Sequence, residues 1–301
     1  MQQNMPFPIK CLGDVEKVDM NKLPHIGSGI KSLDRVIKGL FESQLVVISG
    51  KRGQGKSTFA SWILSNALNQ DRKVFAYSGE LPDYNFRSWL DFQIAGGQNI
   101  DTSHNEWKDE EYTLKDEAAE KLSAYYSGRA YIYDNSYIPT GNLQDSIIGS
   151  IEYAVDTLGC SFILIDNIMT AVNGLDDNKL AMQIDFVKRL KSIATEKKAT
   201  ILLVAHPRKT EQGKALVNDD VAGASEITNL ADIVLTYSRI SGDEKYQSEI
   251  QVTKNRMNGR LAVGKSAIKV SYSLKSKRIY SDDDKNPHEL MCCFKPDFIP
   301  F

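Results

Sequence analysis

A glycine-rich segment between an apolar run and a helical run constrains this chain more than any other feature. Residues 50–58 read GKRGQGKST and follow the apolar residues 45–48. They fit the spacing G-x-x-x-x-G-K-[ST]. Glycine allows the backbone to fold closely around phosphate oxygens, and successive N–H groups at a helix N-terminus direct positive dipoles at them. The segment therefore predicts a phosphate-binding loop between a strand and a helix of an α/β fold.

The residues of this loop have separate predicted roles. Lys56 adds a charge at the β- and γ-phosphates, and Ser57 offers its hydroxyl to Mg²⁺. The predicted phosphate-binding positions are Gly50, Gly53, Gly55, Lys56, Ser57 and Thr58. A glycine-rich turn that matches the spacing by chance is the alternative, and the flanking strand and helix patterns argue against it. We expect the chain to bind ATP, or another NTP or dNTP, together with Mg²⁺.

Length and composition favour one large α/β unit. The chain has 301 residues, 42% of them hydrophobic and 25% charged. We predict an arm at residues 1–29, an ATPase domain at 30–281 with a mostly parallel sheet flanked by helices, and a tail at 282–301. The net charge of −2 excludes a basic surface over the whole protein, so bound nucleic acid requires local loops.

Cysteine usage and hydropathy predict the compartment. The four cysteines show no C-x-x-C spacing, which argues against a zinc ribbon, and the adjacent Cys292 and Cys293 are expected to be free thiols. No apolar run reaches the roughly 18 residues that a membrane span requires, and no signal-peptide core is found near residue 1. These features predict a cytoplasmic protein that does not enter a membrane.

Three further predicted strands end in polar side chains. Residues 73–78 precede Glu80, residues 161–167 include Asp166, and residues 200–206 end at His206. Because the carboxyl ends of parallel strands face the nucleotide, Glu80 can be a general base and Asp166 can hold a metal-bound water. The alternatives are a carboxylate at a helix start for Glu80, an ordinary strand end for Asp166, and a backbone-bonded histidine for His206.

The remaining patterns complete the predicted element order. Helices are expected at 30–40, at 142–158 and at 180–196. Residues 83–127 are expected to be mostly helical, with an interruption at Gly96-Gly97 and a polar stretch. Strands are expected at 130–134, 232–238, 248–254, 267–273 and 277–280, the last two forming an apparent pair.

Two groups of cations lie outside the phosphate loop. The long polar segment after His206 contains Arg208, Lys209 and Lys214, and connections of this length are usually binding loops or disordered. Lys254 and Arg256 end a predicted strand beside the turn Asn258-Gly259. A solvated strand end is the ordinary explanation of the second group.

Taken together, the motifs resemble the RecA-like helicase core of the DnaB superfamily, and most closely the branch with the mitochondrial helicase Twinkle and phage primase-helicases. The resemblance covers about residues 25–281. It is carried by SGIKSLDRVIKGL, GKRGQGKST, YSGEL, FILIDN, LVAHPRKT, GASEITNLADIVL and KNRMNG. Of these, AHPRK and KNR with its following N-G are the most specific, because many ATPases share the other motifs.

The resemblance implies an ATP-dependent 5′–3′ DNA helicase with sites between subunits of a ring, usually a hexamer. It implies that Glu80 is the base and that His206 couples the γ-phosphate to DNA contacts. It further implies that Lys254 and Arg256 reach into the neighbouring subunit's site. Single-stranded DNA would pass loops at about 170–179 and 207–222, with Arg208, Lys209 and Lys214 as contacts, and a primase would be a separate partner. Family members usually carry a further N-terminal domain, whereas this sequence has a predicted arm.

Two other functions fit parts of the pattern. One is a RecA/RadA/KaiC-type DNA-binding, recombination or regulatory module that uses ATP to switch assembly state without unwinding. His206 and the KNR element favour the helicase instead. The other is a degenerate core that acts as a loader or scaffold, and the filled catalytic positions argue against it.

Overall fold

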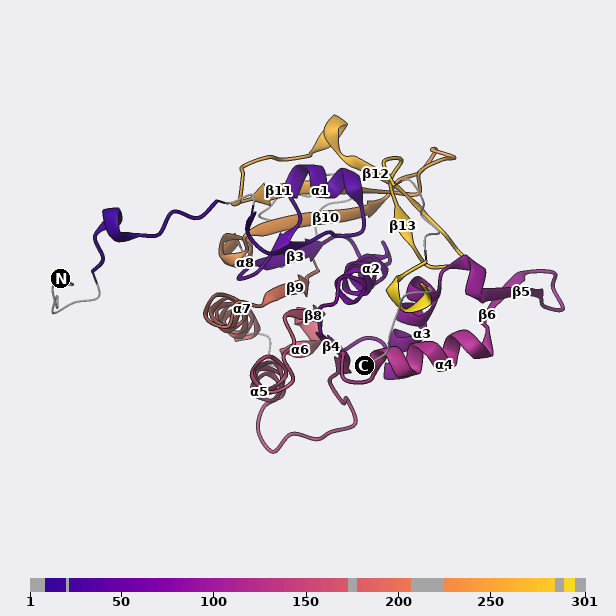
Figure 1. Ribbon diagram of the computed structural model, residues 1–301, viewed down its shortest axis with the longest axis horizontal. Coiled ribbons are helices and arrows are strands. Elements are labelled where there is room, and N and C mark those ends of the chain that lie inside the picture. The colour runs from indigo at the N-terminus through magenta and orange to yellow at the C-terminus, as the bar shows by residue number, and fades with distance from the viewer. Residues whose placement is uncertain (1–8, 20–21, 173–177, 207–224, 285–289, 296–301) are drawn as a thin grey trace.

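A nine-stranded sheet forms the middle of the protein (Figure 1). The computed structural model describes residues 9–19, 22–172, 178–206, 225–284 and 290–295. The strand order is β13-β12-β11-β10-β3-β9-β8-β4-β7. All pairs from β10 to β7 are parallel. These strands are β3 (Leu45–Ser49), β4 (Val74–Ser78), β7 (Ala130–Ile132), β8 (Phe162–Asp166), β9 (Thr200–Val204) and β10 (Ile233–Arg239).

Both faces of the parallel strands are covered by helices, which explains their continuous apolar runs. Every residue of β3, β4, β8 and β9 is buried. Because side chains alternate along a strand, Val46 and Ile48 join one core and Leu45 and Val47 join the other. The first core includes side chains from α1 (Lys31–Ile37), α2 (Lys56–Asn69), α3 (Asp83–Ala95) and α4 (Asp116–Tyr126). The second includes side chains from α5 (Leu143–Asp156), α6 (Ile168–Ala171), α7 (Lys179–Glu196) and α8 (Ser225–Leu230).

The C-terminal strands extend the sheet in antiparallel fashion. They are β11 (Ser248–Asn255), β12 (Ile268–Tyr272) and β13 (Ile279–Tyr280). The predicted α/β class, with a mostly parallel sheet and antiparallel C-terminal strands, is therefore confirmed. None of the described helices combines the length and apolar character that crossing a membrane requires.

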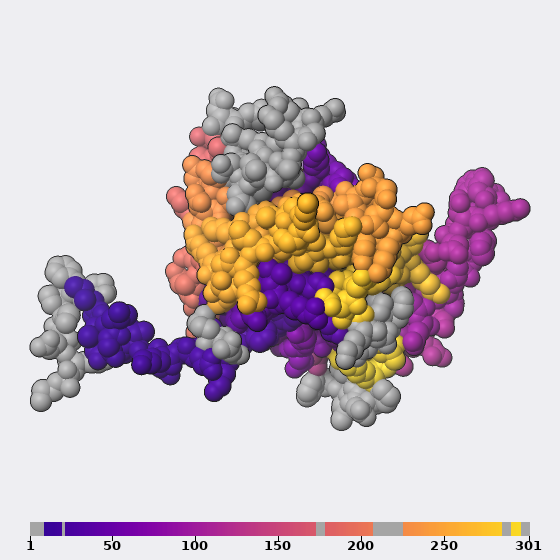
Figure 2. Space-filling view, turned by 90° about the horizontal axis from the view of Figure 1, so that it is seen from above, coloured from indigo at the N-terminus to yellow at the C-terminus, as the bar shows by residue number. Residues whose placement is uncertain are grey.

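Residues 83–127 form two helices with an interruption that begins at Gly96, as predicted, but the interruption contains strands that were not predicted. Between α3 and α4 the chain forms a hairpin of β5 (Ile100–His104) and β6 (Glu110–Leu114), which projects from the molecule in Figures 1 and 2. Only Ile100 of the hairpin is buried. Because both faces are otherwise polar or exposed, the sequence shows no apolar alternation from which a strand could be predicted.

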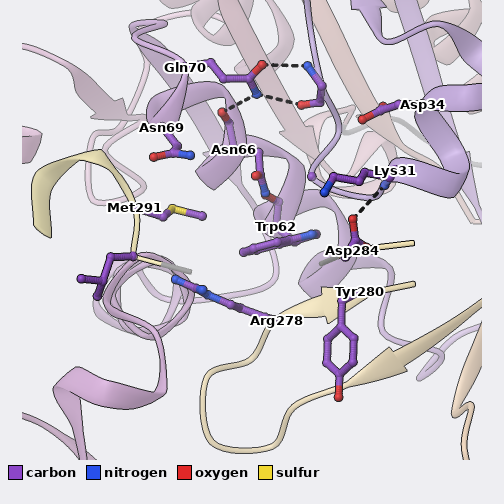
Figure 3. Close-up of a pocket in the computed structure, with 13 residues that line it drawn as sticks. Lys31, Asp34, Trp62, Asn66, Asn69, Gln70, Arg278, Tyr280, Asp284 and Met291 are labelled. Atoms are coloured by element: carbon purple, nitrogen blue, oxygen red, sulfur yellow. Dashed lines mark hydrogen bonds between the residues drawn. The ribbon is translucent and has the colours of Figure 1, made fainter. Parts of the chain in front are cut away.

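Residues on both sides of the predicted domain boundaries contact the core. Strand β1 (His25–Ile26) pairs with β2 (Leu40–Phe41), and Arg35 forms an ion pair with Asp283 at 2.8 Å. A cavity of about 270 Å³ is lined by α2, residues 27–34, residues 278–284 and residues 290–291. Figure 3 shows its lining side chains. The boundaries at residues 29/30 and 281/282 stay predictions. The four cysteines are free, as predicted for Cys292 and Cys293.

The strand register places the polar strand ends side by side. Ser78 of β4 pairs with Asp166 of β8, and Asp166 pairs with Val204 of β9. Val204 also lies level with Ile48 of β3, two residues before Gly50. The carboxyl ends of four neighbouring strands therefore open at one edge of the sheet, where polar side chains that follow them can meet.

Candidate nucleotide-binding site

The loop from β3 to α2 has a backbone that depends on its glycines. The φ angles of Gly53 and Gly55 are 72° and 95°, in the region that favours glycine, and that of Gly50 is 152°. A Cβ added at Gly50 would lie 2.2 Å from the carbonyl oxygen of Tyr237. Helix α2 begins directly after Gly55 without a side-chain cap. Its first N–H groups can therefore bind an anion, as the phosphate-loop prediction requires.

Lys56 is a cation that the fold has removed from water. Its side chain is 5% exposed, and Nζ donates a hydrogen bond to the Lys51 carbonyl oxygen at 2.9 Å. Burial lowers the pKa of Lys56 to about 8, with a smaller contribution from Arg52, while Asp166 and Glu80 act in the opposite direction. An anion placed against Nζ would offset this loss of hydration, which is the chemistry expected of a phosphate.

Asp166 ends β8 with an incompletely satisfied carboxylate. It is 2% exposed, and burial raises its pKa to about 6, although a hydrogen bond with Ser57 and the charge of Lys56 lower it. Its Oδ1 is buried without a hydrogen-bond partner in the described structure. The described residues contain no group of three or more His, Cys, Asp and Glu side chains suited to a metal. Ser57 and Asp166 therefore fit Mg²⁺ only if phosphate oxygens and water complete its ligands.

Glu80 and His206 meet at this edge, as the sequence predicts. His206 Nε2 lies 3.2 Å from Glu80 Oε1, and the side chains are 12% and 50% exposed. Burial alone would raise the pKa of Glu80, but hydrogen bonds with Asn167 and His206 and the charges of His206 and Lys56 together outweigh it, so the pKa is lowered. Burial and the charge of Lys56 lower the pKa of His206. Glu80 is thus a partly exposed carboxylate able to accept a proton from water beside the phosphate loop.

Asn167 is a member of the site that sequence reasoning missed. Its side chain is fully buried, and Nδ2 lies 2.6 Å from Glu80 Oε1 and 3.1 Å from His206 Nε2. Asn167 is the last residue of the FILIDN segment, but the sequence analysis assigned a role only to Asp166 in it. The only signal is that a polar residue directly follows Asp166 at the end of a buried strand.

A second feature that the sequence did not reveal is a cavity beside the phosphate loop. It has a volume of about 400 Å³ and lies between the start of α2 and strands β10 to β12. Its lining includes Gly55, Thr58, Tyr237, Arg239 and Tyr272. Aromatic and guanidinium faces next to a phosphate site could hold a planar base. These residues are far apart in the sequence, so no local motif could have identified them.

Lys254 and Arg256, the predicted fingers that would reach into a neighbouring subunit's site, lie away from their own phosphate loop. Lys254 pairs with Val234, close to the amino end of β10, whereas the loop follows the carboxyl end of the parallel strand β3. Lys254 Nζ donates to the Thr228 carbonyl oxygen at 2.7 Å, and Arg256 lies 3.8 Å from Asp232. The Arg256 side chain is still 51% exposed. The structure therefore does not join the two cations to Lys56, Glu80, Asp166 and His206.

The predicted DNA contacts cannot be placed. Arg208, Lys209 and Lys214 lie outside the described residues. Of the loop predicted at 170–179, residues 170–172 and 178–179 are described. Thr170 and Ala171 belong to α6, which directly follows Asn167.

Comparison with known proteins identifies the family. The model of the DnaB-like helicase C-terminal domain matches residues 25–279, most of the chain. The chain belongs to this family. The replicative DNA helicase DnaB of Pasteurella multocida is 24% identical over 273 residues, 84% of this chain and 55% of that relative. The chain thus spans about half the length of that DnaB. Membership of the DnaB superfamily is confirmed, and closeness to the Twinkle branch stays a prediction.

Solved structures agree on the fold. One is a DnaB-like replicative helicase described with its interactions with primase, and it has a TM-score of 0.66 at 18% identity over 86% of this chain and 63% of that chain. A KaiC-like protein from Pyrococcus horikoshii has a TM-score of 0.59 at 17% identity over 86% of this chain and 99% of that chain. The predicted RecA-like ATPase fold is confirmed.

The lowered pKa of Lys56 predicts how stability depends on pH. Below about pH 8 both folded and unfolded chains hold the proton, and folding must bury the charge. Between about pH 8 and the ordinary value of 10.5 the unfolded chain binds more protons, so stability rises with pH. Without nucleotide, Lys56→Met should therefore be more stable than wild type at pH 7, by an amount that shrinks toward pH 10.

Urea denaturation of both proteins between pH 7 and 10 measures this difference. Lys188→Met provides the control, because Lys188 is exposed on α7 and should give no such trend. A stability difference between Lys56→Met and wild type that stays constant with pH would contradict the buried-charge account.

Proposed function

We propose that the protein is a nucleic-acid-dependent NTPase and a ring-forming 5′–3′ replicative DNA helicase that translocates on single-stranded DNA. One observation carries the proposal: four candidate side chains meet at one edge of the sheet, namely Lys56, Glu80, Asp166 and His206. Family membership supports it, although the matched DnaB is about twice as long. ATP is the proposed nucleotide, with another NTP or dNTP as an alternative.

Each residue has a role that its surroundings support. The loop N–H groups and Lys56 bind the phosphates, and Ser57 and Asp166 hold Mg²⁺, which neutralises developing charge when bound. Glu80 orients the attacking water and accepts its proton. His206 lies 3.2 Å from Glu80, is close enough to Lys56 for that charge to lower its pKa, and is the proposed γ-phosphate sensor. The cavity beside Gly55, which Tyr272 and Arg239 also line, receives the nucleobase.

Subunit contacts complete the proposed site. Lys254 and Arg256 are too far along the sheet to serve their own phosphate loop, and Arg256 is half-exposed. We assign them to the site of a neighbouring subunit in a hexameric ring or filament, where a guanidinium stabilises transferred-phosphate charge. We also propose a separate primase as a partner, in keeping with the DnaB-like structure described with primase.

The alternative is a RecA/RadA/KaiC-type module that uses ATP to change assembly state without unwinding DNA. Its support is the KaiC-like fold that covers 86% of this chain. The two functions differ in a direct observable, because only the helicase separates a duplex.

Strand separation with a catalytic control tests the proposed function. The wild type with ATP and Mg²⁺ should unwind a forked duplex with a free 5′ tail and fail on one with only a 3′ tail. Glu80→Gln keeps the side-chain volume but cannot accept a proton, so it should bind nucleotide normally while turnover falls about 10²- to 10⁴-fold. DNA-dependent hydrolysis without unwinding would favour the alternative module. Loss of nucleotide binding in Glu80→Gln would remove Glu80 as the base.

The proposed DNA contacts are tested by salt dependence. Replacing Arg208, Lys209 and Lys214 together with alanine should weaken binding to different single strands about equally. The slope of log affinity against log salt should fall by roughly 0.7 for each lost phosphate contact. A matched triple replacement of the exposed Lys108, Lys115 and Lys121 should leave the slope unchanged. Equal slopes in wild type and the first variant would place the DNA path elsewhere.

Mixed assemblies test the shared site. Arg256→Ala should bind nucleotide but hydrolyse it poorly, because a finger of this kind contributes about 10³- to 10⁵-fold. Lys56→Ala lacks the phosphate contact but keeps its own finger. In a mixed ring, some interfaces combine the intact phosphate loop of an Arg256→Ala subunit with the intact Arg256 of a Lys56→Ala subunit. The ATPase activity of the mixture should therefore exceed the sum of the activities of the two variants alone. No recovery, in mixtures shown by mass to co-assemble, would leave Lys254 and Arg256 as a solvated strand end.

A further inference from the structure

Asn167 connects the proposed base, Glu80, to helix α6. Its amide nitrogen bonds Glu80, the proposed base, and lies near His206. Its amide oxygen accepts hydrogen bonds from the backbone N–H groups of Met169 and Thr170, at 2.8 and 3.2 Å, and so caps α6. One buried side chain therefore links the base to the helix that opens the predicted DNA loop at 170–179.

The hydrogen-bond inventory gives Asn167 enough donors for both neighbours. An amide has two N–H donors, so Asn167 can serve Glu80 and His206 together. A neutral His206 can use Nε2 either to accept from Asn167 or to donate to Glu80, but not both. In either tautomer of His206, Asn167 still donates to Glu80 and holds the carboxylate.

The backbone at Gly79, next to Glu80, also contacts helix α6. The Gly79 N–H donates to the Asp166 carbonyl oxygen at 2.7 Å. A Cβ at Gly79 would lie 2.1 Å from Thr170 Oγ1, so this turn touches the first turn of α6 directly. Thr170 Oγ1 also donates to the Asn167 carbonyl oxygen at 2.9 Å. Movement of α6 would therefore be transmitted to Glu80 through backbone contact and through the Asn167 amide.

We propose that Asn167 is a positioning residue that fixes Glu80 by one carboxylate oxygen and couples hydrolysis to DNA through α6. A hydrogen bond of 2.6 Å to a carboxylate is of the strong, charge-assisted kind. Without it, a glutamate whose side chain is 50% exposed regains rotamer freedom, and the geometry for attack by water is lost. The inference rests on the proposed hydrolysis with Glu80 as base.

Two substitutions isolate the amide donor. Asn167→Ser and Asn167→Asp both keep an oxygen that can cap α6, since serine and aspartate are favoured caps, and both remove the amide N–H₂ group that donates to Glu80. In each, kcat with single-stranded DNA should fall about 10- to 100-fold while KM for ATP is unchanged. The ratio of kcat with DNA to kcat without DNA should fall toward one.

A matched control excludes a general effect of altering a cap. Asn142 caps α5 by accepting from the Asp145 N–H at 2.8 Å, outside the proposed site, so Asn142→Ser should keep the wild-type kcat and DNA ratio. Asn167→Ser introduced into Glu80→Gln should cost nothing further, because a residue that acts through the base has no effect once the base is gone.

The outcomes separate this inference from the proposed function. No hydrolysis by the wild type, or normal hydrolysis by Glu80→Gln, overturns both. If the wild type is active and Glu80→Gln is impaired, the proposed function stands. Normal kcat and normal DNA stimulation in both Asn167 variants would then overturn only the role of Asn167. A loss in Asn167→Ser that multiplies with the loss in Glu80→Gln also overturns it, since Asn167 would then act independently of the base.

Discussion

The alignment of parallel strand ends is the constraint on which the rest of the structure depends. Strands β4, β8 and β9 are in register so that Ser78, Asp166 and Val204 lie level with one another, and β3 ends beside them. Burial on both faces fixes this register, since a slip by one residue would exchange the side chains of the two cores. The phosphate loop, Glu80, Asn167 and His206 are therefore neighbours because their strands end together.

That edge carries an electrostatic imbalance that suits a phosphate ligand. Lys56 is buried and its pKa is lowered, while Asp166 is buried and its pKa is raised, so both charged forms are disfavoured by lost hydration. Phosphate oxygens beside Lys56 and a cation beside Asp166 would offset both losses. The same groups that cost stability in the free protein thus favour binding of the metal–nucleotide complex.

The sequence was most informative where function requires fixed local spacing. The loop at residues 50–58 and the apolar strands before Glu80, Asp166 and His206 could be read directly, and the family followed from their order. Asn167 could not be assigned, because its partner Glu80 is 87 positions away and no motif records their contact. The cavity beside Gly55 could not be predicted, because residues far apart in the sequence line it. The β5–β6 hairpin could not be predicted, because its strands lack apolar alternation.

The central claim is that this edge binds a nucleotide whose site a second subunit completes. A cryo-electron-microscopy structure of the assembly with a non-hydrolysable ATP analogue, Mg²⁺ and single-stranded DNA tests it most directly. We expect the γ-phosphate against Lys56, the base in the cavity beside Tyr272, and Arg256 of one copy at the phosphates bound by another. Nucleotide bound away from the loop at residues 50–58, or a fully formed site with Arg256 of every copy still on Asp232, would contradict the account.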